Sequence, residues 1–257
     1  MKIFIFALLL VTGLQVVAAV MHSWKAFYTG STGLSEFPEF VALNLLDDEL
    51  MGYFDSKNNT FEGKQSWVTQ KLGQEYVDQE TKALRVNAEY FKNNIDVAMK
   101  RFNQSTGVHI VQRMYGCEWD DETEEVTGFE QYGYDGEDFV SLNMNTKRWI
   151  APKQQGLITT NRWNNDRVYL ESEKNYLTQI CAGWLKKYVD YGRSSLMRTQ
   201  VFHQSPSSRS LLVLLSAATL QVSIPTEQRC SGGKMEWRFM MVWLKERSSL
   251  TMMEPSR

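Results

Sequence analysis

Side chains that could support acid–base, metal or nucleophilic chemistry are scattered along this sequence of 257 residues. The histidines, His22, His109 and His203, are far apart and show no His/Cys spacing typical of a metal site. The sequence contains no Gly-rich phosphate loop and no GxSxG nucleophile motif. The acidic run at residues 120–125 is best explained as a solvated hairpin loop. We therefore expect no enzymatic activity, no metal and no cofactor.

Cysteine and asparagine residues indicate a different kind of chemistry, that of a secreted chain. Cys117 and Cys181 lie in regions of ordered appearance, whereas Cys230 lies in an unusual C-terminal tail. A bridge between the first two would close a loop of about 64 residues and stabilise the fold by roughly 4 kcal/mol on the chain-entropy model. Asn58 and Asn103 each begin an N-x-S/T acceptor pattern. We predict a disulfide between Cys117 and Cys181 and glycans at both asparagines.

The start of the chain has the features of a secretory signal peptide. A short basic beginning, an apolar run and a pair of small residues follow one another within residues 1–19. The apolar run is too short to span a bilayer. The mature chain is therefore expected to begin near Val20 and to fold in an oxidising compartment.

Composition narrows the class of protein further. A net charge of -2 does not give the basic surface that nucleic-acid binding needs. An aromatic content of 12% is enough for a substantial core. The part of the chain that follows the signal peptide is long enough for one well-buried domain or two small ones.

Strand-like and helix-like patterns alternate twice along the mature chain. Residues 23–54 are rich in aromatic and β-branched residues, with a hairpin signal at Asp47 and Asp48. Residues 67–102 then carry apolar side chains at helical spacing. Strand patterns return over 108–150, with a hairpin signal at residues 135–136, and a second helical pattern covers 153–191. This is a repeat of strands followed by a helix.

The repeat predicts an α+β architecture. Two such halves side by side would form one continuous antiparallel sheet with two helices across one face. The helices would be held apart by the width of the sheet and would leave a groove between them, which is the usual form of a ligand site.

Several long motifs resemble one family. VHIVQRMYGCEWDDET, QYGYDGEDF, WIAPKQQ and NYLTQICAGWLKKYVDYGRSSLMRT resemble the second domain of major histocompatibility complex class I heavy chains. HSWKAFYT, FDS and the helix over residues 67–102 resemble the first domain. The resemblance implies an alpha-1 half at 20–106 and an alpha-2 half at 107–199, which together form an eight-stranded antiparallel sheet with two long helices.

The resemblance also implies a function and partners. Members of the family bind a short peptide in the groove and display it to the T-cell receptor, in complex with β2-microglobulin, outside the cell. Carried over by position, the peptide's amino-terminal end is expected to meet Tyr76, Tyr176, Trp184 and Tyr188. The carboxylate end is expected to meet Arg101, Thr159, Arg162 and Trp163, with Phe139 beneath.

The residue types suit these roles. Phenol hydroxyls can donate to and accept from a peptide amino terminus, and a guanidinium pairs bidentately with a carboxylate. Taken without the family, the same tyrosines could be core or helix-face aromatics, and Arg101 and Arg162 could be solvated surface charges.

Some positions depart from the usual class I pattern. Ala26 replaces a Tyr that helps to hold the peptide amino terminus, and the loss of one hydrogen bond to a charged group costs roughly 1.5 to 3 kcal/mol. Peptide binding is then weakened, shifted in register or replaced by another ligand. Arg101 replaces a Tyr of mammalian members and is typical of non-mammalian chains. Phe139 for Tyr and Arg162 for Lys are milder changes.

The tail over residues 200–257 lacks the strand alternation of the immunoglobulin-like alpha-3 domain that the family carries next. A frame shifted one base earlier restores that resemblance. In that frame the codons of residues 240–242 and 252–254 must each give Asp-Gly, and synonymous choices elsewhere allow CHATGFYPDR and WRKDG, which resemble alpha-3 motifs. We expect a frameshift that begins between Met197 and Phe202.

A chain with this tail is expected to lack alpha-3 and the membrane anchor, to be secreted and to bind β2-microglobulin weakly. Two alternatives to peptide display stay open. One is a nonclassical platform with a non-peptide ligand or none, and the other is a secreted decoy that engages receptors without a groove ligand.

Overall fold

The computed structural model describes residues 20–204 of the chain. The predicted signal peptide and Cys230 lie outside these residues. No side chain of the predicted frameshifted tail, His203 included, is described. The predictions made for them therefore stay predictions.

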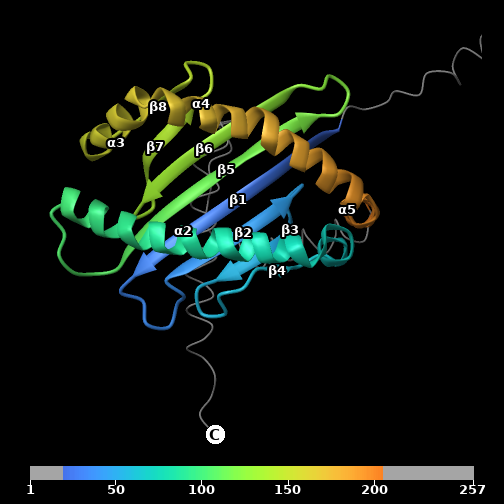
Figure 1. Ribbon diagram of the computed structural model, residues 1–257, viewed down its shortest axis with the longest axis horizontal. Coiled ribbons are helices and arrows are strands. Elements are labelled where there is room, and N and C mark those ends of the chain that lie inside the picture. The colour runs from blue at the N-terminus through green and yellow to red at the C-terminus, as the bar shows by residue number, and fades with distance from the viewer. Residues whose placement is uncertain (1–19, 205–257) are drawn as a thin grey trace, which may run out of the picture.

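Eight antiparallel strands form a single sheet in the order β4-β3-β2-β1-β5-β6-β7-β8 (Figure 1). The strands β1 and β5 meet at its centre, so the two halves of the chain contribute four neighbouring strands each. This confirms the predicted continuous sheet. The strands are β1 (Met21–Thr32), β2 (Phe40–Leu46), β3 (Glu49–Asp55), β4 (Glu62–Gly63), β5 (His109–Asp120), β6 (Val126–Tyr134), β7 (Glu137–Asn143) and β8 (Arg148–Ile150).

The helices cross one face of this sheet in two rows (Figure 1). The first row is the π-helix η1 (Val68–Leu72) followed by α2 (Gly73–Arg101). The second row is α3 (Gln154–Asn165), α4 (Arg167–Asn175), the π-helix η2 (Tyr176–Ile180) and α5 (Cys181–Gln204). The predicted helical regions are confirmed, although each is interrupted and α5 runs beyond the predicted end at residue 191.

Two residues explain the interruptions. Gly73 has φ +82°, a left-handed conformation that glycine adopts without steric cost, and it separates η1 from α2. Asp166 is extended, and its side chain accepts a hydrogen bond from the backbone N–H of Tyr169 at 3.0 Å. It is thus the N-cap of α4.

The predicted hairpin turns are confirmed. Asp47 and Asp48 link β2 to β3 with φ of 48° and 64°, and Asp135 and Gly136 link β6 to β7 with φ of 50° and 81°. Positive φ at both central positions is the conformation that two-residue hairpins favour. The acidic run begins at the last residue of β5 and continues as the turn to β6 over residues 121–125, as predicted.

The core lies between the helices and the sheet. On α2, the predicted apolar stripe is buried at Phe91, Ile95 and Ala98. In the second row, Leu177, Cys181, Leu185 and Tyr188 are buried, but Ile180 and Trp184 are 45% and 37% exposed. The ring of Trp184 lies against those of Tyr76 and Tyr188.

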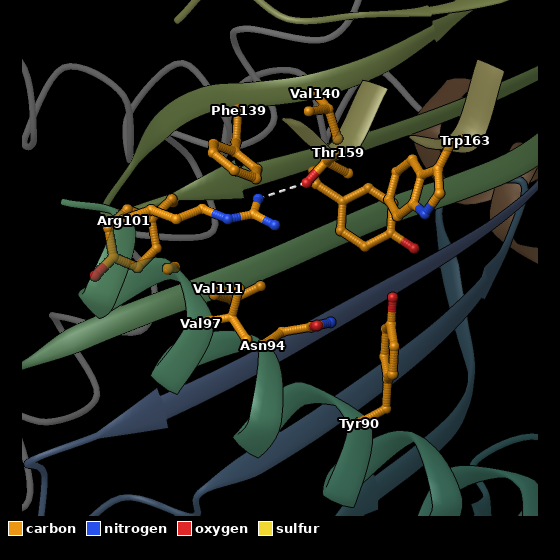
Figure 2. Close-up of a pocket in the computed structure, with 13 residues that line it drawn as sticks. Tyr90, Asn94, Val97, Arg101, Val111, Phe139, Val140, Thr159 and Trp163 are labelled. Atoms are coloured by element: carbon orange, nitrogen blue, oxygen red, sulfur yellow. Dashed lines mark hydrogen bonds between the residues drawn. The ribbon is translucent and has the colours of Figure 1, made fainter. Parts of the chain in front are cut away.

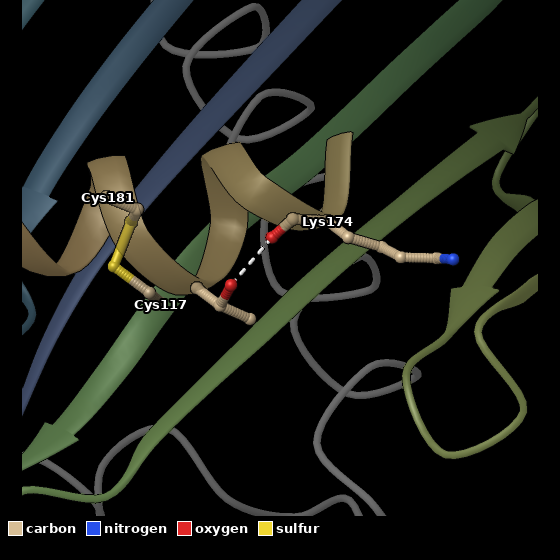
Figure 3. The surroundings of a disulfide bond; sticks show 4 residues. Cys117, Lys174 and Cys181 are labelled. Atoms are coloured by element: carbon tan, nitrogen blue, oxygen red, sulfur yellow. Dashed lines mark hydrogen bonds between the residues drawn. A yellow bond between two sulfur atoms is a disulfide. The ribbon is translucent and has the colours of Figure 1, made fainter. Parts of the chain in front are cut away.

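The predicted disulfide is confirmed. Cys117 lies on β5 and Cys181 begins α5, and their sulfurs are bonded (Figure 3). The bond ties the second row of helices to a central strand across 64 residues of sequence. Both predicted glycosylation sites, Asn58 and Asn103, are exposed. Within residues 20–204, no helix combines the length and hydrophobicity needed to cross a bilayer.

A close approach between β6 and η2 gives a test of the packing. A Cβ added at Gly128 would lie 2.6 Å from the Cβ of Leu177. We expect Gly128→Ala to lower the free energy of unfolding by about 1 to 3 kcal/mol through overpacking. Gly183, in α5, has nothing within 4 Å of such a Cβ. Gly183→Ala should therefore raise stability by about 0.5 to 1 kcal/mol, and urea denaturation of both variants checks the pair of predictions.

The two halves of the chain repeat a His–Asp contact. His22 Nδ1 lies 2.7 Å from Asp47 Oδ2, and His109 Nδ1 lies 2.9 Å from Asp135 Oδ2. Each aspartate also accepts a hydrogen bond from the backbone of its own half, at Ser23 N and at Ile110 N. Each contact therefore joins the beginning of the first strand of its half to a hairpin turn.

The second of these contacts makes stability depend on pH. The hydrogen bond to Asp135 raises the pKa of His109. A raised folded pKa stabilises the fold fully below the unfolded value of about 6.5, and the contribution is lost as pH rises through the folded value. In Asp135→Asn, this dependence should vanish, so the stability difference from wild type should shrink between acid and mildly alkaline pH. A difference that is constant with pH would contradict this.

Candidate functional site

The two rows of helices border the region where the sequence predicts a groove. Figure 1 shows α2 along one side and α3, α4 and α5 along the other, with the sheet between them. Side chains on the helix-facing side of β1, β5 and β6 form the floor. The sequence predicted a groove with two chemically different ends, and the side chains at these ends are described in turn.

One end of the groove contains a cavity of about 70 Å³ (Figure 2). Arg101 at the end of α2 donates a hydrogen bond from Nη1 to Thr159 Oγ1 on α3, at 2.6 Å, so the two rows of helices are in contact here. The cavity has room for a side chain and not for a whole ligand. Its lining residues are Tyr90, Asn94, Val97, Ala98, Arg101, Val111, Tyr132, Gly133, Tyr134, Phe139, Val140, Thr159 and Trp163.

Most of the residues expected around the peptide carboxylate line this cavity. Arg101, Thr159, Trp163 and Phe139 are all part of its wall. Arg162 is exposed and is not among the lining residues. The cavity thus has a charged guanidinium beside a largely apolar interior, an arrangement that suits a carboxylate next to an apolar side chain.

Aromatic hydroxyls gather at the other end. The hydroxyls of Tyr76 on α2 and Tyr188 on α5 are 2.9 Å apart. The ring of Trp184 stacks on Tyr188 with centroids 5.6 Å apart and is partly exposed. The structure therefore brings together three of the four residues expected at the peptide amino terminus.

The fourth, Tyr176, lies slightly further along the groove. Its ring is 6.1 Å from that of Tyr115 on β5, whose hydroxyl is 2.8 Å from that of Tyr28 on β1. Ala26 faces the same side of β1 as Tyr28, is paired with Tyr115 across the strands and is completely buried. Tyr28 and Tyr115, which the sequence analysis did not single out, thus supply phenol groups next to the Ala26 position.

A carboxyl group at this end was also missed. Glu80 lies one helical turn after Tyr76 on α2, and burial raises its pKa to about 7. Burial, and then the charge of Glu80, raises the pKa of Tyr76. The spacing of four residues from Tyr76 was the signal that could have placed Glu80 in the groove. In its ionised form, this carboxyl can accept a hydrogen bond from an ammonium group.

The centre of the groove contains a second missed cluster. Arg113 on β5 contacts Glu130 on β6 through Nε at 2.8 Å and Nη2 at 2.7 Å. Glu173 on α4 has Oε2 at 3.9 Å from Arg113 Nη2. Arg113 and Tyr115 are two residues apart on β5, and Glu130 and Tyr132 are two residues apart on β6. Residues at this spacing share one face of a strand, so all four side chains lie on the helix-facing side.

These contacts define what the site can do. It offers a guanidinium at one end, phenol hydroxyls and a carboxyl at the other, and a charged cluster between them. Among residues 20–204, no group of three or more His, Cys, Asp or Glu side chains could hold a metal ion. The site is equipped to bind an elongated ligand with opposite charges at its ends.

Comparison with known proteins identifies the family of this chain. A profile of the family described as Class I Histocompatibility antigen, domains alpha 1 and 2, matches residues 20–196. The chain is 35% identical over 183 residues to the H-2 class I histocompatibility antigen, K-K alpha chain, of Mus musculus, covering 69% of this chain and 49% of that protein.

A second kind of relative is also similar. The chain is 34% identical over 163 residues to major histocompatibility complex class I-related protein 1 of Mus musculus, covering 63% of this chain and 47% of that protein. It is 32% identical over 197 residues to the Bos taurus protein of the same name, covering 75% and 57%. The chain spans about half the length of the curated relatives it matches.

The chain therefore belongs to the major histocompatibility complex class I family and carries its alpha-1 and alpha-2 platform. This confirms the resemblance and the fold class that the sequence indicated. The family is not enzymatic, which confirms that the chain is not an enzyme.

Proposed function

We propose that this chain is an antigen-presenting molecule that binds a short peptide in the groove and displays it to a T-cell receptor. The observation that carries the proposal is the cavity with Arg101 and Thr159 in its wall. A guanidinium beside an apolar cavity matches a peptide's terminal carboxylate and its last side chain. The phenol groups of Tyr76 and Tyr188 supply hydrogen bonds for the other end.

The face of the sheet opposite the helices carries an apolar cluster that favours a second binding partner. Phe27 on β1 and Met114 on β5 form a small apolar cluster there, with Leu43, Leu45 and Phe129 packed against it. Apolar clusters on an antiparallel sheet commonly pack against another protein layer. We propose β2-microglobulin as the partner of this face, and the secretory pathway and the outside of the cell as the location.

A second candidate function is a nonclassical platform with a non-peptide ligand. Ala26 favours it, because this position has a methyl group where a hydroxyl would help to hold a peptide amino terminus. The likeness to the two class I-related proteins also favours it. On this alternative, the phenol groups of Tyr28 and Tyr115 would face the ligand.

Ligand elution separates the two functions. The full chain would be refolded with β2-microglobulin and a random peptide mixture, purified as a complex, and its ligands released in acid and identified by mass spectrometry. Peptide display predicts short peptides of narrow length that share an apolar carboxyl-terminal residue. A stable complex that releases no peptides would overturn the proposal and favour the nonclassical platform.

A further inference from the structure

The centre of the groove has more negative than positive groups. The guanidinium of Arg113 is the ion-pair partner of both Glu130 and Glu173. On α4, Lys174 contacts Glu171 at 2.7 Å. Among the described residues, Arg113 is the one cation whose nitrogen lies within 4.0 Å of a carboxyl oxygen of Glu130 or Glu173.

One acceptor in this cluster is unsatisfied. Glu130 is buried, and both hydrogen bonds from Arg113 reach its Oε1. Its Oε2 is buried without a hydrogen-bond partner among the described residues. A protonated Glu173 can hydrogen-bond to Glu130. Once Glu173 is ionised, the buried carboxylate of Glu130 has an unmet requirement for a donor, which is costly.

The cluster is also within reach of a ligand. The side chains of Arg113 and Glu173 are 16% and 20% exposed, whereas Glu130 lies completely buried beneath them. The Arg113 guanidinium lies over the rings of Tyr115 and Tyr132, at 4.1 Å and 5.5 Å. Tyr132 lines the cavity near Arg101, and Tyr115 contacts Tyr176 near the other end. The cluster therefore lies between the two ends of the groove.

We propose that Glu173 and Glu130 form a site for a cationic side chain, lysine or arginine, at an interior position of the bound ligand. The inference rests on the proposed function, since it concerns the peptide that the groove would hold. An ammonium or guanidinium supplies the missing positive charge and the missing donor together. An acidic side chain would add a third negative charge and is disfavoured.

The protonation of Glu173 gives the site a pH dependence. Burial, and then the charge and hydrogen bonding of Glu130, raises the pKa of Glu173 to about 7. Glu173 interacts with Arg113 from β5, Glu130 from β6 and Tyr169 from α4. Tyr132 from β6 and Tyr90 from α2 interact in turn with Tyr169. Below pH 7 the carboxyl is mostly neutral and attracts a cation less. Binding of a cationic side chain should therefore strengthen as pH rises through about 7.

The test uses the full chain refolded with β2-microglobulin and pools of short peptides. Within a set, the pools differ at one interior position, fixed as lysine, as norleucine or as glutamate, and each interior position is tested in turn. At one position we expect the lysine pool to bind about tenfold more tightly than the norleucine pool near pH 8, which corresponds to about 1.4 kcal/mol. The preference should be lost near pH 5.5.

Two variants localise the effect. Glu173→Gln should abolish the lysine preference and its pH dependence. Glu122→Gln should leave both unchanged, because its side chain is exposed in the turn between β5 and β6. If Glu173→Gln does not fold, the pH series on the wild-type chain still decides the question.

The possible failures are distinct. Pools that bind without a lysine preference at any interior position would overturn this inference and leave peptide display standing. A preference that persists in Glu173→Gln and near pH 5.5 would place the cation elsewhere and would also overturn it. If no pool binds at all, the proposed function fails, and the cationic site fails with it.

Discussion

Replacing both Cys117 and Cys181 by alanine should lower the free energy of unfolding by about 4 kcal/mol. The bridge closes 64 residues and anchors the start of α5 to a central strand. Its removal frees the unfolded chain and also loosens the row of helices that carries Trp184 and Tyr188. Native domains of this kind have only about 5 to 15 kcal/mol in total, so we expect refolding yields to fall steeply. Urea denaturation of the refolded complex measures the loss.

A third cysteine provides the matched control. Cys230→Ser leaves the observed bridge intact, so the urea midpoint should not change. A loss as large as that of the double variant would show that the effect is not specific to the bridge. Wild-type chain in a reducing buffer should resemble the double variant.

Arg101→Ala should weaken the binding of a peptide by about 2 kcal/mol or more, which is about 30-fold in affinity. The substitution removes the guanidinium that borders the cavity and its hydrogen bond to Thr159. A bound carboxylate would then have no charged donor at this point. Fluorescence-polarisation competition with a peptide eluted from the wild-type chain measures the change.

Two controls show whether the lost contact is to the carboxylate. The same peptide with a carboxyl-terminal amide should bind the wild-type chain more weakly and should lose little more in Arg101→Ala. Arg162→Ala should have a smaller effect, because this side chain is exposed and outside the cavity lining. Equal losses for the two arginine variants would show that the carboxylate is not held mainly at Arg101.

Much of the fold could be predicted from local patterns. The hairpins at Asp47 and Asp135 and the stripe of Phe91, Ile95 and Ala98 depend on turn chemistry and helical periodicity, which a single sequence displays. The break at Gly73 could not be placed, because one glycine within a helical pattern does not show whether its φ is positive. Ile180 fits the helical spacing of the second region but is partly exposed, because the apolar stripe of η2 and α5 is wider than the face that the sheet covers.

Site residues could be predicted where a family motif contains them. They could not be predicted where only contacts between distant segments bring them together. Arg101 and Thr159 were both expected around the peptide carboxylate, and Arg101 Nη1 lies 2.6 Å from Thr159 Oγ1. Arg113, Glu130 and Glu173 come from β5, β6 and α4, and no short motif joins them. Their significance arises from burial and from a charge imbalance that only the assembled groove creates. Glu80 is an intermediate case, since its spacing of four residues from Tyr76 could have indicated that both face the groove.

The pairing of β1 with β5 at the centre of the sheet has a consequence for synthesis. Met21 pairs with Asp120, and Thr32 pairs with His109, so every contact along this seam joins residues far apart in sequence. A ribosome adds about 5 to 20 residues per second, so on the order of several seconds separate the synthesis of β1 from that of β5. During that interval, one long edge of β1 has no native partner, and such edges are prone to pair with other chains. The nascent first half is therefore the stage at which this chain most needs a chaperone, and slowing translation before β5 should increase aggregation.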